Sequence, residues 1–149
     1  MIAEIGAGHG GSLYMWSRGV NSAKLIVSID IEFLTGKRLL ESFKSDAEVH
    51  VLQANSHSEN TVEQLQEILG GRKIDFLYID GDHSYEGVIQ DFEMYTPLVG
   101  EDGIVILDDV DNTISAPEVP EAWNQIKENN DAYAFKESEK SSAQGIVQL

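Results

Sequence analysis

Short apolar runs alternate with amphipathic segments along most of this chain. Five runs rich in β-branched, aromatic or leucine residues are typical of buried strands and cover residues 2–5, 25–29, 49–52, 74–79 and 104–107. Two further apolar runs, residues 132–135 and 145–149, are joined by a polar link of nine residues. A link this short favours an antiparallel hairpin at the end of the chain.

The segments between these runs carry apolar residues at the 3.6-residue spacing of a helix. One helix is expected over residues 12–18, and a second around Leu34, Lys37, Leu39, Leu40 and Phe43. A third is predicted to be capped by Asn60 and ended by Gly70, and a fourth to cover residues 85–95. A fifth is expected to start near Ser115 with Pro117 in its first turn, and to bury Val119, Ala122, Trp123 and Ile126.

Strands that alternate with helices predict an α/β fold with right-handed crossovers. The expected architecture is a doubly wound, mostly parallel seven-stranded sheet with a C-terminal antiparallel hairpin. A turn is expected at residues 100–103, just before the fifth strand. The 149 residues are enough for one domain with its own core, and we expect residues 1–149 to form a single domain.

The charge balance narrows the range of partners. Asp and Glu total 26 against 10 Lys and Arg, for a formal net charge of -16. Proteins that bind nucleic acids neutralise phosphates with Lys and Arg, so nucleic acid is not expected as a partner. The chain has no cysteine, no leader pattern and no apolar run near the roughly 20 residues of a membrane span. A cytoplasmic protein without a membrane partner is therefore expected.

A glycine-rich loop follows the first predicted strand. Gly6, Gly8 and Gly11 have the spacing of the dinucleotide fingerprint, and Asp30 ends the next strand, where an acid can bind ribose hydroxyls. The glycines let the backbone approach a ligand, and a helix N-terminus offers free N–H groups to it. This pattern alone favours NAD and S-adenosylmethionine (SAM) almost equally.

Acidic residues end two other strands. Asp80, Asp82 and His83 follow the fourth strand, and Asp108 and Asp109 follow the fifth. Carboxyl ends of neighbouring parallel strands meet at one edge of a sheet, where ligands bind. Such acids also serve as helix caps and turn residues. Three of them on neighbouring strands, Asp80, Asp108 and Asp109, favour a shared hard cation such as Mg²⁺ or Ca²⁺.

The run Glu4-Ile5-Gly6-Ala7-Gly8 resembles the first motif of class I SAM-dependent methyltransferases, and the resemblance covers nearly the whole chain. The stretches EIGAGHGGS and IDGDHSYEGVIQDFEMYTPLVGEDGIVILDDV, with Asn55-Ser56, resemble a metal-dependent branch. That branch contains catechol-type and macrocin-type O-methyltransferases and cephalosporin-hydroxylase-like proteins. The resemblance implies cofactor binding by Glu4, Gly6, Ala7, Gly8, Asp30, Asn55 and Ser56, with Asn55 near adenine.

In the same branch a divalent cation is held by an acid ending strand four and two residues ending strand five. Asp80, Asp108 and Asp109 match those places, and His83 lies three residues after Asp80, as in macrocin-type enzymes. The resemblance therefore implies Mg²⁺ at the three acids and catalytic roles for Asp80 and His83, with the imidazole as general base. Asp82 is the rival base. The other histidines, His57 among them, are expected to be structural.

Family members usually carry helices before the first strand, which cover the cofactor and substrate or build dimers; here the first strand begins almost at once. The resulting expectation is a Mg²⁺-assisted SAM-dependent O-methyltransferase acting on a small hydroxylated molecule, with a homodimer as a possible assembly. Two alternatives stay open at this point. One is an NAD-binding oxidoreductase, favoured by the glycine loop and Asp30. The other is a SAM-binding domain without turnover, favoured by the short start.

Overall fold

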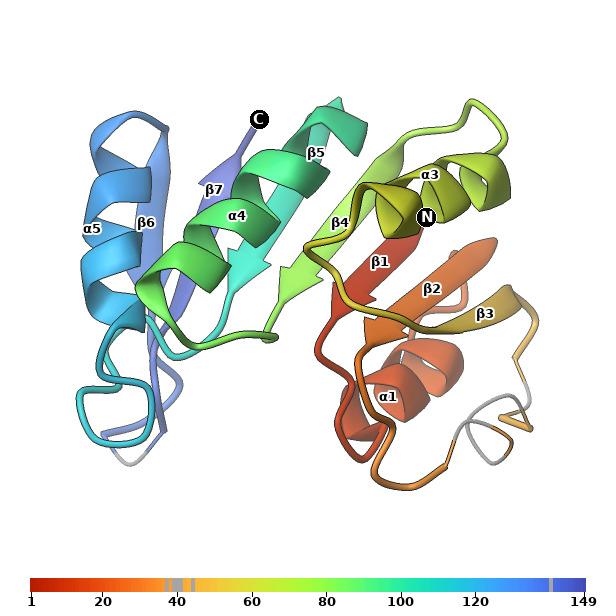
Figure 1. Cartoon of the computed structure of the whole chain (residues 1–149), viewed down its shortest axis with the longest axis horizontal. Coiled ribbons are helices and arrows are strands. Elements are labelled where there is room, and N and C mark those ends of the chain that lie inside the picture. The colour runs from red at the N-terminus through yellow and green to blue at the C-terminus, as the bar shows by residue number, and fades with distance from the viewer. Residues whose placement is uncertain (37, 39–41, 44, 140) are drawn as a thin grey trace.

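Seven strands form one sheet in the order β3-β2-β1-β4-β5-β7-β6 (Figure 1). Their bounds are β1 Ile2–Ile5, β2 Leu25–Asp30, β3 Glu48–Gln53, β4 Ile74–Ile79, β5 Val99–Leu107, β6 Ala132–Phe135 and β7 Gln144–Gln148. The first five strands are parallel, and β7 runs antiparallel to both β5 and β6. The predicted fold class and its C-terminal hairpin are therefore confirmed.

The computed structural model describes all residues except 37, 39–41, 44 and 140. The described helices are α1 Gly11–Gly19, α3 Glu59–Leu69, α4 Tyr85–Tyr95, the short 3₁₀ helix η1 Thr96–Leu98, and α5 Val119–Glu128. The helix expected around Lys37, Leu39 and Leu40 lies outside the described residues. Within the described part of the chain, no helix has the length and apolar character needed to cross a membrane.

The strands bury alternate residues on opposite faces of the sheet. Ala3 and Ile5 of β1 belong to the larger core, which also holds buried side chains of α3, α4 and α5. Ile2 of the same strand belongs to a second core with Leu13 of α1. Helices on both faces leave the ends of the parallel strands as the exposed edges of the sheet, which is where loops can form a site.

Three local predictions were wrong. Helix α3 is capped by Ser58 instead of Asn60, because the Ser58 carbonyl already accepts the backbone N–H groups of Thr61 and Val62. Helix α5 begins at Val119, so the proline in its first turn is Pro120, and the Ser115 start is not used. Residues 100–103 form an irregular part of β5 instead of a turn before it.

The loops that follow β1 and β4 meet at the carboxyl edge of the sheet. Gly6 has a φ of +88°, and a Cβ there would overlap the carbonyl group of Asp80. The backbone N–H of Asp80 in turn donates to the carbonyl of Ile5 at 2.8 Å. Glycine at position 6 is therefore required both by the backbone conformation and by the neighbouring chain.

Replacing Gly6 with alanine should destabilise the protein far more than replacing Gly8. Gly8 also has a positive φ, +49°, but open space surrounds the place of its missing Cβ. Gly8→Ala should cost about 1–2 kcal/mol from the left-handed backbone alone. Gly6→Ala adds an overlap with backbone that cannot turn away, for a total of at least about 3 kcal/mol. Urea denaturation of both variants measures the difference, and equal losses would contradict the required contact.

Candidate functional site

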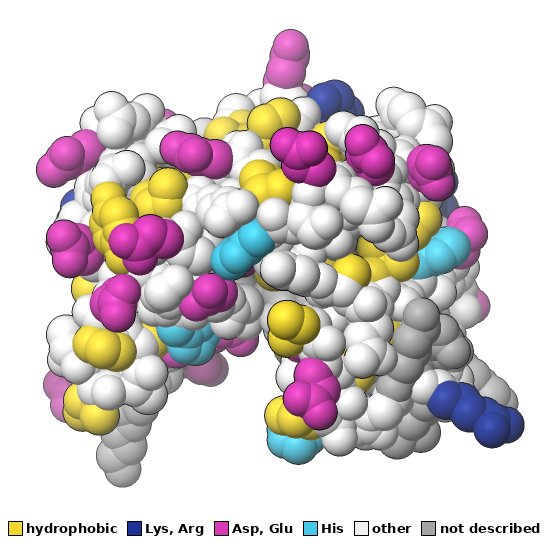
Figure 2. All heavy atoms as spheres, in the orientation of Figure 1, with side chains coloured by type: hydrophobic (Ala, Val, Ile, Leu, Met, Phe, Trp, Pro, Cys, Tyr) yellow, Lys and Arg dark blue, Asp and Glu magenta, His cyan; other side chains and the backbone are white. Residues whose placement is uncertain are grey.

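A cleft of about 850 Å³ opens at the carboxyl edge of the sheet, where the loops after β1, β2, β3 and β4 converge. Figure 2 shows the molecule hollowed on this side, with acidic side chains far more frequent than basic ones on the visible face. The lining includes most of the residues predicted to bind a cofactor: Gly6, Ala7, Gly8, Asp30, Asn55 and Ser56. Asp80, Asp82 and His83 line the same cleft. The structure thus brings two separately predicted groups into one space.

Asp30 holds the glycine loop in place. Its Oδ2 accepts the backbone N–H of Gly8 at 2.7 Å, and its Oδ1 accepts that of Glu32 at 2.9 Å. Each carboxylate oxygen keeps a lone pair for a further donor, such as a ligand hydroxyl. The next residue, Ile31, also lines the cleft with an exposed apolar side chain. This side of the cleft can therefore bind a ligand that is polar at one end and flat and apolar at the other.

Glu4 lies behind the loop and does not line the cleft. Its side chain is fully buried, accepting the Ser28 hydroxyl at 2.7 Å and the Trp16 indole N–H at 3.3 Å. Burial raises the pKa of this carboxyl, and the hydrogen bonds from Ser12, Ser28 and Trp16 partly oppose that rise. A direct cofactor contact by Glu4, as the resemblance implied, does not follow from this position. Its place suits support of the glycine loop.

Asn55 and Ser56 form the wall that follows β3. The Asn55 side-chain oxygen accepts the backbone N–H of His57 at 3.0 Å, and its carbonyl accepts the Thr61 hydroxyl at 2.7 Å. The Ser56 carbonyl accepts the hydroxyl of Tyr95, a residue of α4, at 2.8 Å. Hydrogen bonds from α3 and α4 therefore hold Asn55 and Ser56 in place.

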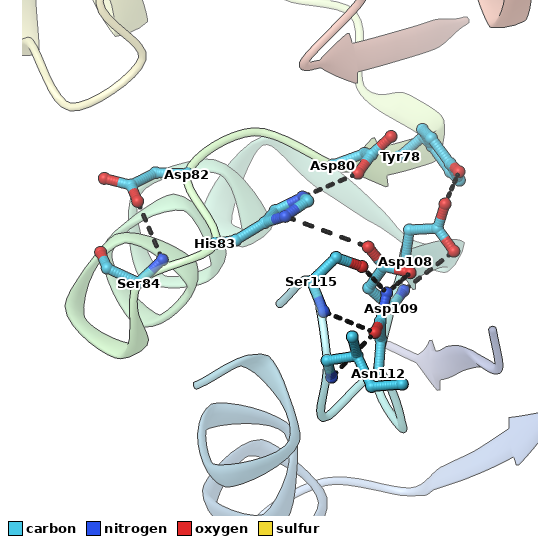
Figure 3. A network of polar contacts seen from close by, with 10 residues as sticks. Tyr78, Asp80, Asp82, His83, Ser84, Asp108, Asp109, Asn112 and Ser115 are labelled. Atoms are coloured by element: carbon cyan, nitrogen blue, oxygen red, sulfur yellow. Dashed lines mark hydrogen bonds and ion pairs between the residues drawn. The ribbon is translucent and has the colours of Figure 1, made fainter. Parts of the chain in front are cut away.

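His83 lies between two aspartates that come from different strand ends (Figure 3). Its Nε2 is 3.1 Å from Oδ1 of Asp80, and its Nδ1 is 3.9 Å from Oδ2 of Asp109. All three side chains offer ligand atoms within 4.8 Å of one another. Two carboxylates and one imidazole at this separation can surround a cation.

Asp80 and His83 shift each other's pKa. Burial raises the pKa of Asp80, and the hydrogen bond from His83 acts against that rise. The same hydrogen bond to Asp80 raises the pKa of His83, against the opposite effect of burial. Asp80 therefore stabilises the protonated imidazole, and a cation bound to Asp80 would remove part of this stabilisation.

Asp108 borders this group, and its charge adds to the rise in the pKa of Asp80 that burial causes, but its hydrogen bonds go to other partners. It accepts the hydroxyl of Tyr78 at 2.8 Å through Oδ2 and the backbone N–H of Asp109 at 2.9 Å through Oδ1. Asp109 has a φ of +59°, a left-handed backbone conformation that non-glycine residues seldom adopt. Of the three acids predicted to bind a metal, the structure groups Asp80 and Asp109 with His83 and turns Asp108 to Tyr78. Tyr78 is not among the site residues predicted from the sequence, although period-two alternation places it on the same side of β4 as Asp80.

Asp82 faces away from this group in Figure 3 and accepts the backbone N–H of Ser84 at 2.9 Å. That hydrogen bond lowers the pKa of the Asp82 carboxyl. Ser84 caps α4 by accepting the Gly87 N–H at 3.1 Å. Asp82 is therefore a turn residue and a poor base, whereas His83 is directed into the acidic group.

The chain is similar to a known protein family and to a viral protein. A family model described as a methyltransferase domain matches residues 3–110. An uncharacterized protein of Acanthamoeba polyphaga mimivirus is 31% identical over 131 residues, which cover 83% of this chain and 57% of that protein. The chain thus spans little more than half the length of this relative.

Two solved structures show the same fold. An O-methyltransferase of Bacillus cereus in complex with SAH (S-adenosylhomocysteine) matches with a TM-score of 0.66 and 21% identity, over 99% of this chain and 73% of the other. A methyltransferase of the mycinamycin biosynthetic pathway, in complex with Mg, SAH and mycinamycin VI, matches with a TM-score of 0.66 and 17% identity, over 99% and 43% of the two chains. The sheet order and the C-terminal hairpin are those of the Rossmann-like methyltransferase fold.

The contact between His83 and Asp80 predicts an elevated imidazole pKa in the metal-free protein. In a proton NMR titration, His83 should titrate above the usual value of about 6.5. Asp80→Asn should move its pKa down toward that value, because the carboxylate that stabilises the protonated ring is gone. The ring signals of His50, which pairs with Glu48 on β3, serve as the internal control. A titration of His83 that is the same in both proteins would contradict the contact.

Proposed function

Because the chain belongs to the methyltransferase domain family, we propose that it transfers a methyl group from SAM to a hydroxyl of a small molecule, assisted by a divalent cation. One observation supports this most. A single cleft joins the glycine loop with Asp30 to the side chains of Asp80 and His83, and Asp109 lies against His83. A cofactor and a deprotonating group would therefore lie next to each other, as methyl transfer to oxygen requires.

The cleft fits SAM by its own chemistry. The Asp30 carboxylate can accept ribose hydroxyls, since each of its oxygens accepts one backbone N–H and keeps a further lone pair. Ile31 offers an apolar surface to a flat base, and Asn55 and Ser56 offer polar groups beside it. When bound, SAM supplies a methyl group on a positively charged sulfur, which an oxygen nucleophile can attack. The acidic surroundings of the cleft suit this positive charge.

The acidic group fits a hard divalent cation. Asp80 and Asp109 supply carboxylate oxygens, the ligands that suit Mg²⁺ or Mn²⁺, while the imidazole of His83 beside them is kept for the role of base. Such a cation would lower the pKa of an acceptor hydroxyl. Asp108 supports the site indirectly, because its hydrogen bonds with Tyr78 and the Asp109 N–H fix the turn that aims Asp109.

His83 is the residue best placed to remove the hydroxyl proton. It reaches into the cleft from the turn after β4, and its two ring nitrogens lie near Asp80 and Asp109. A neutral imidazole accepts the proton through a ring nitrogen, and Asp80 then stabilises the imidazolium that forms. The pKa of His83 is raised in the metal-free protein, so the base is neutral only at higher pH until the charge of Asp80 is shared with a cation.

The acceptor is expected to be small and not polyanionic. The net charge of -16 disfavours a nucleic acid, and the carboxylates of Asp80, Asp82 and Asp109 would repel phosphates at the site itself. An NAD-dependent oxidoreductase shares the glycine loop, but membership of the methyltransferase family favours SAM. A hydroxylated small molecule, such as a sugar or a phenol, is the substrate class that this site suits.

Calorimetry tests the cofactor. Wild-type protein should bind SAM and SAH but not NAD, with or without Mg²⁺. Asp30→Ala should weaken SAH binding about tenfold or more, since hydrogen bonds to a charged group contribute about 1.5–3 kcal/mol each. Asp102→Ala serves as the control, because this exposed acid lies at the opposite end of β5. Tight NAD binding without SAH binding would overturn the proposal.

A turnover assay tests the reaction. SAH release from SAM should appear with a panel of sugars and phenols in the presence of Mg²⁺, and a chelator should abolish it while SAH binding persists. On an acceptor found this way, His83→Ala should lower kcat about 10²- to 10⁴-fold with little change in SAH affinity. The acid limb of the pH profile, where the base becomes protonated, should disappear in this variant.

The neighbouring acids provide a matched pair for the same assay. Asp109→Asn should raise the Mg²⁺ concentration needed for half-maximal rate more than Asp108→Asn does, because Asp109 offers a ligand atom beside Asp80 and His83 whereas Asp108 is hydrogen-bonded to Tyr78. Full activity in chelator would show that the acids are structural. Binding of SAM without turnover on any hydroxylated compound would favour a cofactor-binding domain over an enzyme.

A further inference from the structure

A fully buried carboxylate, Asp91, lies beneath the cleft. It belongs to α4 and has no exposed surface. Among the described residues, no well-aligned hydrogen bond reaches either of its oxygens. The ionisable nitrogen beside it is Nε2 of His57, which is 3.3 Å from Oδ1 and is itself buried without another partner in the described chain. The two side chains therefore depend on each other.

Asp91 is positioned between two walls of the cleft. On one side is His57, which lines the cleft at the end of the wall formed by residues 54–57. On the other side is the loop after β4, where a Cβ at Gly81 would lie 3.2 Å from Oδ2 of Asp91. Helix α4 also holds this wall through the Tyr95 hydroxyl, which donates to the Ser56 carbonyl. The pair thus lies where the two halves of the cleft meet.

A buried acid of this kind does not favour folding. Burial raises the pKa of Asp91, and the side chains of Ser56 and His57 only partly oppose that rise. Apolar residues in place of buried ion pairs are often equally or more stabilising. A role in the cleft, rather than in stability, would explain why an acid occupies this position.

We propose that Asp91 is a positioning residue for His57, and that the pair orients the wall of residues 54–57 for the adenine base of the cofactor. This inference rests on the proposed function. The Asp91 carboxylate, 3.3 Å from His57 Nε2, favours the ring orientation and the tautomer that direct the Nε2 proton toward it. The rest of the imidazole then has a fixed position at the cleft, where it can contact a flat, uncharged heterocycle. Affinity for the nucleoside depends on this orientation.

Calorimetry with SAH tests the pair. Asp91→Asn, which keeps the shape but removes the charge, should weaken SAH binding about tenfold. His57→Ala should weaken it to a similar degree, and adding Asp91→Asn to His57→Ala should have no further effect, because Asp91 acts only through the ring. Asp102→Asn is the matched control on the far end of β5 and should bind like wild type.

Two further readouts separate positioning from a structural role. Thermal unfolding without ligand should show a melting temperature for Asp91→Asn that is equal to or above that of wild type, whereas a structural role predicts a lower one. Wild type should prefer SAH over S-inosylhomocysteine, whose base carries an oxygen in place of the amino group, and Asp91→Asn should reduce that preference.

The outcomes are distinguishable from failure of the proposed function. If wild-type protein binds neither SAM nor SAH, the proposed function fails. If wild type binds SAH and Asp91→Asn binds it equally well, the role of the pair is refuted. The same conclusion follows if the two substitutions weaken binding additively, or if weaker binding comes with a lower melting temperature and an unchanged preference between the two bases.

Discussion

The close contact between the loops after β1 and β4 is the constraint on which the site depends. Gly6 leaves room for the carbonyl of Asp80, and its own N–H donates to the carbonyl of Ile29 in β2 at 2.9 Å. Three adjacent strands are thereby tied together at the edge where they end. The glycine loop with Asp30 and the acidic group around His83 are consequently two parts of one rigid edge, so their separation does not depend on flexible loops.

Most of the acidic side chains at this edge of the sheet accept hydrogen bonds from nearby groups. Each carboxylate there has its own partner: His83 for Asp80, the Tyr78 hydroxyl for Asp108, and the Ser84 N–H for Asp82. Asp109 accepts the Asn112 side-chain N–H at 3.1 Å and lies 3.9 Å from His83. Burial and the charges of Asp108 and Asp109 raise the pKa of Asp80, and the hydrogen bond from His83 opposes that rise.

The strands, their order of appearance and the terminal hairpin could be predicted because apolar periodicity depends only on local sequence. The grouping of Asp80 with His83 could also be predicted from local sequence, since the two residues lie three positions apart in one turn. The different partners of Asp108 and Asp109 could not, because the turn they lie in has a left-handed backbone at Asp109 that non-glycine residues seldom adopt. The contact of His57 with Asp91 was also missed, since it requires the packing of α4 beneath the loop after β3. The start of α5 was predicted wrongly because Ser115 and Pro117 are residue types that commonly begin a helix, whereas α5 begins at Val119.

The two tryptophans of the chain lie in different environments, so intrinsic fluorescence can report on two parts of the protein. Trp16 donates to the buried Glu4 behind the glycine loop, with ring centroids 5.2 Å from Phe76 and 6.0 Å from Tyr78. Trp123 packs against Gly145 in the layer between α5 and the hairpin, remote from that loop in the sequence and on the other face of the sheet. Indole fluorescence depends on nearby charge and hydrogen bonding. Emission from Trp16 would therefore report changes at the glycine loop, while emission from Trp123 would report the integrity of the C-terminal layer.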